Sequence, residues 1–507
     1  MTTPEPGGHT LGRWTADHAR LTPTKVAIDE RGTRTTYAEL DARAAVLAQR
    51  LRAAGYRPGD RIATLTRNST AHVVLLFACA KAGLVLAPLS WRLSTEELAY
   101  QLTHCRPALV AVAPELADDV AAAHPPAPVV HLGRDGMERA VPAAGSHPGP
   151  DRPPQDEDPL LLIYTSGSAS RPRGVVLTHA NCFWTNLSLS GAAGMTTEDV
   201  VLSVLPQHHV GGWNVQPLLA WWRGATVVLE PTFDAAAVLE LLARHRVTTM
   251  MGVPSHYQQL AELPGFATAD LSGLTHMIVG GAPMPERLLR TWHGRGVRVI
   301  QGYGLTEAAP NVLLLPPEDA FDHLGSVGKP YPHVEVELAD PATGRRVEGP
   351  GTGELLVRGP AVFAGYFADD GATAAARDGG WLRTGDLATR DADGYFRIVD
   401  RLSNMYISGG ENVSPAQVED VLRRHPAVGD VAVVGVPDER WGEVGRAVVV
   451  PADPRRPPTD EELLDHCRAH LATFKVPRSV AFVTELPRTA LHKVRRAALR
   501  PQHEEIR

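Results

Sequence analysis

The chain has 507 residues, of which 44% are hydrophobic, and its formal net charge at pH 7 is -7. This length exceeds what a single hydrophobic core usually supports, and the apolar content is too high for a disordered chain, so we expect two or more packed domains. Because the charge balance is acidic and no basic run is found beyond residues 493–500, nucleic acid is not an expected partner.

The apolar stretches of the chain are short. The N-terminal residues MTTPEPGGHTLGRW contain no apolar run of signal-peptide length, and residues 71–80 fall short of a membrane span. We therefore expect a soluble, cytoplasmic protein. The cysteines lie far apart with no CxxC spacing, which argues against a zinc site and gives no reason to infer disulfides.

Residues 36–120 alternate helical patterns with short apolar runs. This alternation predicts βαβ units around a mainly parallel sheet. The helical patterns and the apolar runs cover residues 37–54, 69–83 and 95–105, and residues 61–66, 84–89 and 108–113, respectively. Residues 124–159 are rich in Pro, Gly and Asp, and we expect a surface connector there.

The same rhythm returns over residues 200–300, where the runs ATVVLE, TTMMGV, HMIVGG and VRVIQG predict a second α/β layer. Between residues 334 and 399 the helical patterns fade, and short strands alternate with Gly and Asp turns, which indicates a small β-rich unit. After residue 400 we expect a compact α+β terminal domain. Its helices and strands are predicted at residues 414–425 and 460–471, and at residues 428–436 and 447–451.

Residues 161–179, LLIYTSGSASRPRGVVLTH, place a loop of hydroxyls and glycine between two apolar runs. Around Gly167, small residues let backbone N–H groups approach an anion; Thr165, Ser166 and Ser168 can donate hydroxyls, and Arg173 supplies positive charge. The spacing is not that of a Walker loop. The segment favours phosphate binding, and an ordinary turn is the alternative.

The segment GYGLTE follows the apolar run 297–300, and ligands of α/β proteins usually bind at the carboxyl ends of strands. Tyr303, between Gly302 and Gly304, can stack on a base, and Glu307 can hold Mg²⁺. The alternative is a β-turn with Thr306 as a cap.

Three later segments also carry groups that could contact a nucleotide. In WLRTGD, Asp386 follows a Gly turn and can accept both hydroxyls of a ribose, although Asp in a turn usually caps the backbone. In SGGEN, adjacent glycines permit close approach of a ligand to the backbone. In LPRTALHKVRRAALR, Lys493 lies in a loop before a predicted basic helix, where the alternative is a solvated surface charge.

Taken together and in this order, these segments resemble the adenylate-forming superfamily of acyl-CoA synthetases, luciferases and peptide-synthetase adenylation domains. The resemblance spans residues 14–500 and is strongest to bacterial fatty-acyl- and aryl-CoA ligases, through HVGGWNVQPLLAWWRGATVVL, GGAPMPE and VVGVPDERWGEVG. It implies an α/β fold with a large N-terminal domain, residues 1–399, of two α/β subdomains plus a β-barrel-like unit. A hinge at residues 400–404 would join it to a small mobile α+β domain, residues 405–507.

The resemblance also assigns roles to single residues. It implies Lys493, Thr306, Glu307 and His209 as catalytic residues, and Glu307 as the metal ligand. It implies an acyl pocket bordered by His209, Trp213 and Gly302. The nucleotide and phosphate contacts that it implies are Thr165, Ser166, Gly167, Ser168, Arg173, Gly281, Ala282, Pro283, Gly302, Tyr303, Gly304, Asp386, Arg401, Ser408, Gly409 and Gly410.

The activity implied is ATP-dependent activation of a fatty or aromatic carboxylic acid. The acid and ATP would give acyl-AMP and pyrophosphate with Mg²⁺ as cofactor, and coenzyme A would then accept the acyl group as a thioester. The implied partners are the small-molecule acid, ATP and CoA. The oligomeric state stays open, with a homodimer as one option.

The chain departs from the family pattern at several motif positions. Ser170 stands where Gly is usual and Arg173 where Lys is usual; Ser403 replaces a Lys or Asp, and His492 replaces a Gly before Lys493. One interpretation is drift with CoA ligase activity retained. Another is a relative with a different acceptor or oxyanion, such as amide formation or nitrite-dependent diazotisation.

A third interpretation is a nucleotide-binding scaffold without catalysis. It is disfavoured, because Glu307, Asp386, Arg401 and Lys493 are all kept.

Overall fold

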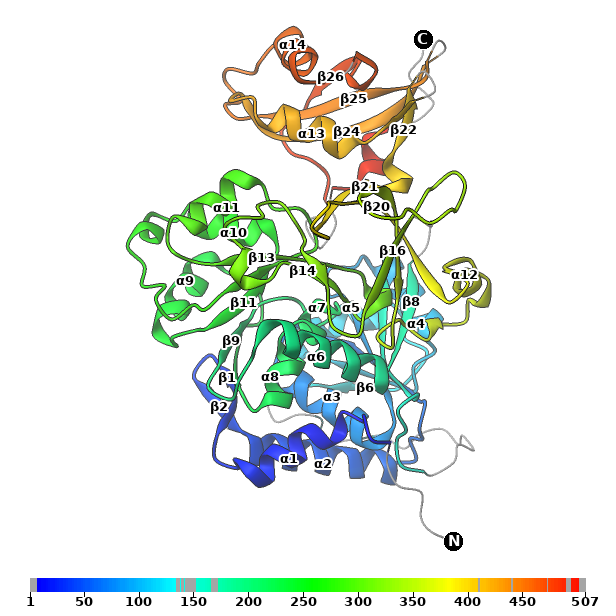
Figure 1. Cartoon of the computed structure of the whole chain (residues 1–507). Coiled ribbons are helices and arrows are strands. Elements are labelled where there is room, and N and C mark those ends of the chain that lie inside the picture. The colour runs from blue at the N-terminus through cyan, green and yellow to red at the C-terminus, as the bar shows by residue number, and fades with distance from the viewer. Residues whose placement is uncertain are drawn as a thin grey trace. The chain divides into compact units, whose positions relative to one another are not determined.

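The computed structural model (Figure 1) describes residues 7–133, 137, 141, 152–165, 172–408, 411–438, 441–471, 473–488 and 494–500. Contacts group the chain into two compact units. One contains Met1–Val336 and Val357–Arg383, and the other Glu337–Leu356 and Thr384–Arg507. Among the described residues, none of the helices has the length and apolar character needed to cross a membrane.

The first sheet of the larger unit confirms the predicted βαβ organisation. Strands β3, β4, β5 and β6 pair in parallel, and β7 pairs in parallel with β4. β7 then pairs antiparallel with β8, so a hairpin forms one side of the sheet. The order is β18-β8-β7-β4-β3-β5-β6, with bounds Gly365–Tyr366, Arg173–Thr178, Pro159–Thr165, Val85–Leu89, Arg61–Leu65, Leu109–Val112 and Val129–His131.

The helices of this region begin and end where their capping residues stand. Thr36 and Ser94 form capping boxes at the starts of α2 (Tyr37–Ala53) and α4 (Thr95–Cys105). Ser69 caps α3 (Thr70–Ala82), which ends at Gly83 in the left-handed conformation. Nearly every residue of α3 is buried, which explains its continuous apolar run. Two further helices are α1 (Gly12–Leu21) and α5 (Ala117–Ala122).

Among the described residues of the expected connector, 124–159, the strand β6 was not predicted by the sequence analysis. β6 adds to the sheet edge in parallel with β5, through pairs such as Ala111 with Val130. A strand of three residues is too short to display a period of two, so its pattern carries no signal.

The second sheet confirms the predicted second α/β layer. Strands β1, β10, β9, β11, β12 and β13 are parallel to one another, and β2, β14 and β15 add antiparallel edges. The order is β15-β14-β13-β12-β11-β9-β10-β1-β2, with bounds Lys329–Pro330, Asn311–Leu314, Val299–Gly304, Met277–Val279, Thr249–Gly252, Val200–Ser203, Thr226–Leu229, Val26–Glu30 and Thr33–Thr36.

Helices α9, α10 and α11 lie beside β11 and β13 (Figure 1). Leu241, Tyr257 and Trp292, one from each helix, share a buried cluster with Val279 of β12. The buried Tyr257 hydroxyl donates to the Ile278 carbonyl at 2.7 Å, which satisfies its polar group. The α-helices between β8 and β20 are α6 (His179–Ala193), α7 (Gly211–Asn214), α8 (Pro217–Arg223), α9 (Ala235–Arg244), α10 (Pro254–Ala261), α11 (Glu286–His293) and α12 (Asp370–Ala375).

The predicted β-rich unit is a small sheet of order β16-β17-β20-β19, with β21 paired to β20. The terminal region has the predicted α+β character, with a sheet of order β23-β22-β25-β24 and β26 on β25. Helices α13 (Pro415–Arg423) and α14 (Asp460–His470) pack on it through Leu422, Leu463 and Val433. The strands β16, β17, β19, β20, β21, β22, β23, β24, β25 and β26 cover Glu335–Ala339, Gly351–Arg358, Arg377–Asp378, Trp381–Arg390, Phe396–Arg401, Tyr406–Ser408, Glu411–Val413, Val428–Asp438, Gly442–Pro451 and Ser479–Phe482.

Buried histidines predict how stability depends on pH. Burial lowers the pKa of His72 from 6.5 to about 3 and that of His179 from 6.5 to about 4. The stabilisation from their neutral rings is fully present above pH 6.5 and is lost as the pH falls toward these folded-state values, because the unfolded chain takes up protons that the folded chain refuses. Between pH 6.5 and the folded-state pKa, each ring lowers the free energy of unfolding by about 1.4 kcal/mol for each pH unit of acidification.

Denaturant unfolding at pH 7, 6 and 5 checks this expectation. The His179→Asn variant should flatten the slope, since an Asn oxygen can still accept the Leu11 N–H that His179 Nδ1 accepts at 3.2 Å. The control is His470→Asn at an exposed position, which should leave the slope unchanged. A wild-type stability that is flat between pH 7 and 5 contradicts the expectation.

Candidate active site

Several predicted site segments follow adjacent parallel strands of the second sheet. Gly281 follows β12, Gly302 and Tyr303 lie near the end of β13, and His209 comes after β9. Since these strands are parallel and adjacent in the order β13-β12-β11-β9, the segments after them lie along one edge of the sheet. The carboxyl edge of such a sheet is the usual ligand-binding position in α/β proteins.

The turn after β13 depends on glycine. A Cβ at Gly304 would lie 1.5 Å from the Pro310 carbonyl oxygen, so only glycine fits this close backbone approach. Gln301 ties β13 to its neighbours, because its Oε1 accepts from the Met284 N–H and its Nε2 donates to the Ser326 carbonyl. The turn places Thr306 and Glu307 in a short 3₁₀ helix, Thr306–Ala308.

Glu307 is held by a residue that the sequence analysis missed. The Tyr366 hydroxyl donates to Glu307 Oε1 at 2.8 Å. Burial, followed by the charge of Glu307, raises the pKa of Tyr366, so its proton is available for this bond at neutral pH. The backbone fixes the same contact, since the Phe363 N–H donates to the Glu307 carbonyl at 2.8 Å.

The same tyrosine also contacts Arg173 of the predicted phosphate loop. The Arg173 guanidinium lies 5.3 Å from the centre of the Tyr366 ring, and its Nε is 3.7 Å from Asp369 Oδ2. Arg173 pairs across the β7–β8 hairpin with Thr165. One cluster therefore joins a cation, a hydroxyl and a carboxylate from three distant segments, and we name Arg173, Glu307, Tyr366 and Asp369 the phosphate-side cluster. The GY pair at residues 365–366, after the strand GELLVRG, is the sequence feature that marks the missed tyrosine.

His209 lies in a loop anchored by a buried polar network. Gln207 accepts from the Trp213 indole N–H through its carbonyl at 2.5 Å, and its Oε1 lies 3.1 Å from His72 Nδ1. Trp213 is fully buried and packs edge-on against His72, so its ring is part of the interior. His209 is half-buried, with its ring 4.5 Å from that of His208. Burial, followed by His209 and Arg92, lowers the pKa of His208 well below its ordinary value.

The second unit contains the predicted ribose contacts. Asp386 lies within strand β20 rather than in a free turn, and the residue before it, Gly385, has a φ of 69°. Asp386 is buried and its Oδ1 lies 3.0 Å from Nε of Arg401, which is directly opposite on β21. Ser408 is also buried, at the end of β22. Within this unit, therefore, Asp386 and Arg401 form one paired group.

Two family models match this chain. The family described as AMP-binding enzyme matches residues 15–367, and its C-terminal domain matches residues 417–493. The chain belongs to the AMP-binding enzyme family. The match covers more than half of the chain and includes residues 165–173 and 302–307, so the chain is an enzyme with the adenylate-forming fold.

Several characterised enzymes resemble the chain over nearly its full length. A feruloyl-CoA synthase from an Amycolatopsis species is 43% identical, with 97% of this chain and 98% of the relative covered. The crystal structure of ATP-bound MatB from Rhodopseudomonas palustris is 33% identical, with a TM-score of 0.88 and coverage of 97% and 98% of the two chains. The amide bond synthetase McbA from Marinactinospora thermotolerans is 31% identical, with a TM-score of 0.86 and the same coverage.

Some residues expected from the family pattern lie outside the described part of the chain. They are Ser166, Gly167, Ser168, Gly409, Gly410 and Lys493. The basic helix expected after Lys493 is a single 3₁₀ turn, Arg496–Leu499.

One family departure has a direct test. Because a Lys at position 173 keeps the charge but loses the contact of the guanidinium with the Tyr366 ring, we expect Arg173→Lys to lower kcat/KM for ATP about threefold, the equivalent of one exposed cation–π contact. Arg173→Met, which removes the charge, should cost about a hundredfold. Pyrophosphate release under limiting ATP measures both. Equal effects of the two variants contradict a role for the charge.

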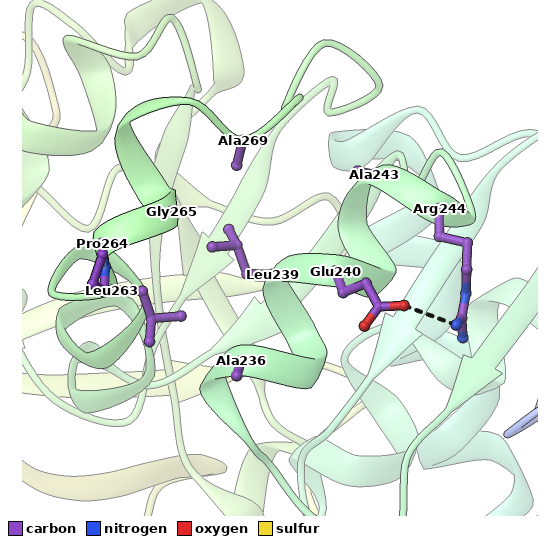
Figure 2. A pocket seen from close by; sticks show the side chains of 9 residues that line it. All are labelled: Ala236, Leu239, Glu240, Ala243, Arg244, Leu263, Pro264, Gly265 and Ala269. Carbon is purple, nitrogen blue, oxygen red and sulfur yellow. Dashed lines mark hydrogen bonds and ion pairs between the residues drawn. The ribbon is translucent and has the colours of Figure 1, made fainter.

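A surface hollow of about 700 Å³ lies elsewhere in the larger unit (Figure 2). Its walls are α9 and residues 263–269, and its lining includes Leu239, Leu263 and the Glu240–Arg244 ion pair. None of the predicted site residues that the structure describes is among its lining residues. The sheet-edge segments and the phosphate-side cluster thus remain the candidate site.

Proposed function

We propose that the chain activates an aromatic carboxylic acid with ATP and then transfers the acyl group to coenzyme A. The observation that carries the adenylation step is the phosphate-side cluster, in which Tyr366 links Glu307 to Arg173. Likeness to a feruloyl-CoA synthase at 43% identity over 97% of this chain supports an aromatic acid and a CoA acceptor.

In the first step a carboxylate oxygen attacks the α-phosphorus of ATP, and the bond from that phosphorus to the pyrophosphate oxygen breaks. Negative charge builds on the phosphoryl oxygens, so preorganised cations and donors lower the barrier. We assign this task to Arg173, in the last pair of the β7–β8 ladder, and to Thr306 and Lys493. Glu307 is a carboxylate in the same cluster, and without a bound cation its negative charge would repel the phosphates.

A divalent cation would account for the charge of Glu307. Mg²⁺ is commonly held by one or two carboxylates together with substrate phosphates, and Glu307, oriented by the Tyr366 hydroxyl, fits that pattern. When bound, Mg²⁺ would neutralise charge on the phosphates. Tyr366 and the backbone N–H of Phe363 keep Glu307 in one orientation for this purpose.

The nucleoside end is assigned to the other predicted contacts. Tyr303 with residues 281–283 would contact adenine, and Asp386 would accept the ribose hydroxyls. Arg401 holds the Asp386 carboxylate at 3.0 Å, which keeps a buried charge paired until the ribose binds. His209, Trp213 and Gly302 would border the acyl group.

Thioester formation requires a thiolate to attack the carbonyl carbon of acyl-AMP, with AMP as the leaving group. We assign it to a second orientation of residues 405–507 about a hinge at residues 400–404, with Ser408, Gly409 and Gly410 along the thiol path. Asp400 supports a defined hinge, because it accepts from the Arg401 N–H at 2.7 Å and from the Ser414 hydroxyl at 2.8 Å.

A panel of acids tests the substrate class. Purified protein with ATP, Mg²⁺ and CoA is given ferulate, other cinnamates, phenylacetates, benzoates and fatty acids of matched concentration. The highest kcat/KM should belong to an aromatic acid. If kcat/KM for a fatty acid exceeds that for every aromatic acid by more than about tenfold, the aromatic substrate class is wrong, although adenylation still stands. A tenfold ratio corresponds to about 1.4 kcal/mol of contacts in the acyl pocket.

An amine acceptor is the second candidate. It is supported by the likeness to the amide bond synthetase McbA and by the departures at Ser403 and His492. Nitrite-dependent diazotisation is a related alternative. Mass spectrometry of reactions containing CoA, an amine or nitrite separates them, since each acceptor gives a product of different mass.

Location and assembly complete the proposal. We propose a cytoplasmic enzyme that works as a homodimer, and cell fractionation and light scattering test these two points.

A further inference from the structure

Strands β7 and β8 flank residues 166–171. The ladder ends at the pair Thr165 with Arg173. Pro172 precedes Arg173 and has no N–H. Gly174 accepts from the Phe367 N–H rather than from β7. Because the facing direction alternates along a strand, the Pro172 carbonyl also points away from β7 and can take a partner outside the β7–β8 ladder.

Helix α4 contacts both ends of the hairpin. The Tyr100 hydroxyl donates to the Pro172 carbonyl at 3.2 Å. One turn later, His104 Nδ1 shares a hydrogen bond of 2.8 Å with the Tyr164 hydroxyl. Positions four apart on a helix lie on one face, and the two rings stack 5.6 Å apart. One face of α4 thus contacts both strands of the hairpin.

Neighbouring groups keep these rings in place. The Tyr164 hydroxyl also donates to the Gln101 carbonyl, at 3.4 Å. His104 packs edge-on against Phe367, whose backbone N–H donates to the Gly174 carbonyl at 2.7 Å. Phe367 follows Tyr366 directly, so the same segment contacts the hairpin and the phosphate-side cluster. Burial raises the pKa of Tyr164, which keeps its hydroxyl protonated.

We propose that Tyr100 and His104 are positioning residues for the phosphate loop, holding both of its ends in the geometry that binds ATP. This rests on the proposed function, because it assumes that residues 165–174 bind phosphate. Neither side chain needs to contact the nucleotide. Their contribution is to reduce the backbone freedom that would otherwise be lost when ATP binds.

The variants Tyr100→Phe and His104→Phe test the proposal, since each keeps a ring and removes one hydrogen bond. Each should raise KM for ATP about fivefold, the equivalent of one net hydrogen bond. The double variant should raise it about twenty-fivefold if the two bonds are independent. KM for the acid and the melting temperature should stay close to those of the wild type.

Tyr56→Phe is the matched control. Tyr56 is fully buried, and its hydroxyl has no hydrogen-bond partner among the described residues. Removing that hydroxyl should leave KM for ATP unchanged. If Tyr100→Phe and His104→Phe behave like this control, or if they raise KM for the acid as much as KM for ATP, the positioning role is overturned.

Hydrogen exchange without substrates separates this proposal from the proposed function. Backbone amides of residues 160–178 should exchange faster in both α4 variants than in the wild type and in Tyr56→Phe. This readout is independent of catalysis, so a wild type that releases no pyrophosphate with any acid counts against the function alone. Unchanged exchange in both variants counts against the positioning role alone.

Discussion

Replacing Lys493 with Ala should lower the rate of pyrophosphate release by about a hundredfold to a thousandfold. This corresponds to about 2.7–4 kcal/mol of transition-state stabilisation. The reason is that a cation aimed at the phosphoryl oxygens acts only as charge develops there. Transfer from preformed acyl-AMP to CoA should remain largely intact. Rapid-quench assays of the two half-reactions measure this difference.

A second lysine in the terminal region provides the control. Lys475 Nζ donates to Gln417 Oε1 at 2.8 Å, so it has a structural partner. Lys475→Ala should leave both half-reactions within a small factor of the wild type. Equal loss of both half-reactions in Lys493→Ala would contradict the assigned role and would point to a folding defect.

Replacing Glu307 with Gln should lower pyrophosphate release about a hundredfold at physiological Mg²⁺. Gln keeps an oxygen that accepts the Tyr366 hydroxyl but loses the negative charge that a divalent cation requires. Part of the loss should be recovered at high Mg²⁺ concentration. A Mg²⁺ titration of the initial rate, with ATP in excess, measures both effects.

The control for Glu307→Gln is a carboxylate in an exposed pair. Glu240 lies 3.0 Å from Arg244 on α9, and such surface pairs contribute about 0–1 kcal/mol. Glu240→Gln should leave the rate and its Mg²⁺ dependence unchanged. If Glu307→Gln keeps the wild-type rate at every Mg²⁺ concentration, Glu307 does not serve the metal.

Much of the fold could be predicted because local signals agree with it. Ser69 and Gly83 are typical residues for the start and end of a helix, and they bound α3. The parallel pairing of β3 with β4 and β5 follows from strands separated by helices. The sequence predicted a basic helix after Lys493, but the structure has a single 3₁₀ turn there. Val494 and Leu499 pack against residues of β24 and β25, and this tertiary contact is not visible in the local sequence.

The site could be predicted only in part, for physical reasons that single residues illustrate. Glu307 and Arg173 stand in motifs whose chemistry is visible locally. Tyr366 is distant in sequence from both and reaches them only because β18 pairs with β8. Tyr100 appears as an ordinary position of an amphipathic helix until the fold places it beside Pro172.

The central claim is that this enzyme forms an acyl-adenylate and passes the acyl group to CoA. The most direct measurement follows pyrophosphate and acyl-CoA together, with and without CoA, for the best acid of the panel. The account predicts equal amounts of the two products when CoA is present, and acyl-AMP with little turnover when it is absent. Pyrophosphate without any thioester would contradict the CoA acceptor, and no pyrophosphate with any acid, despite ATP binding, would contradict adenylation itself.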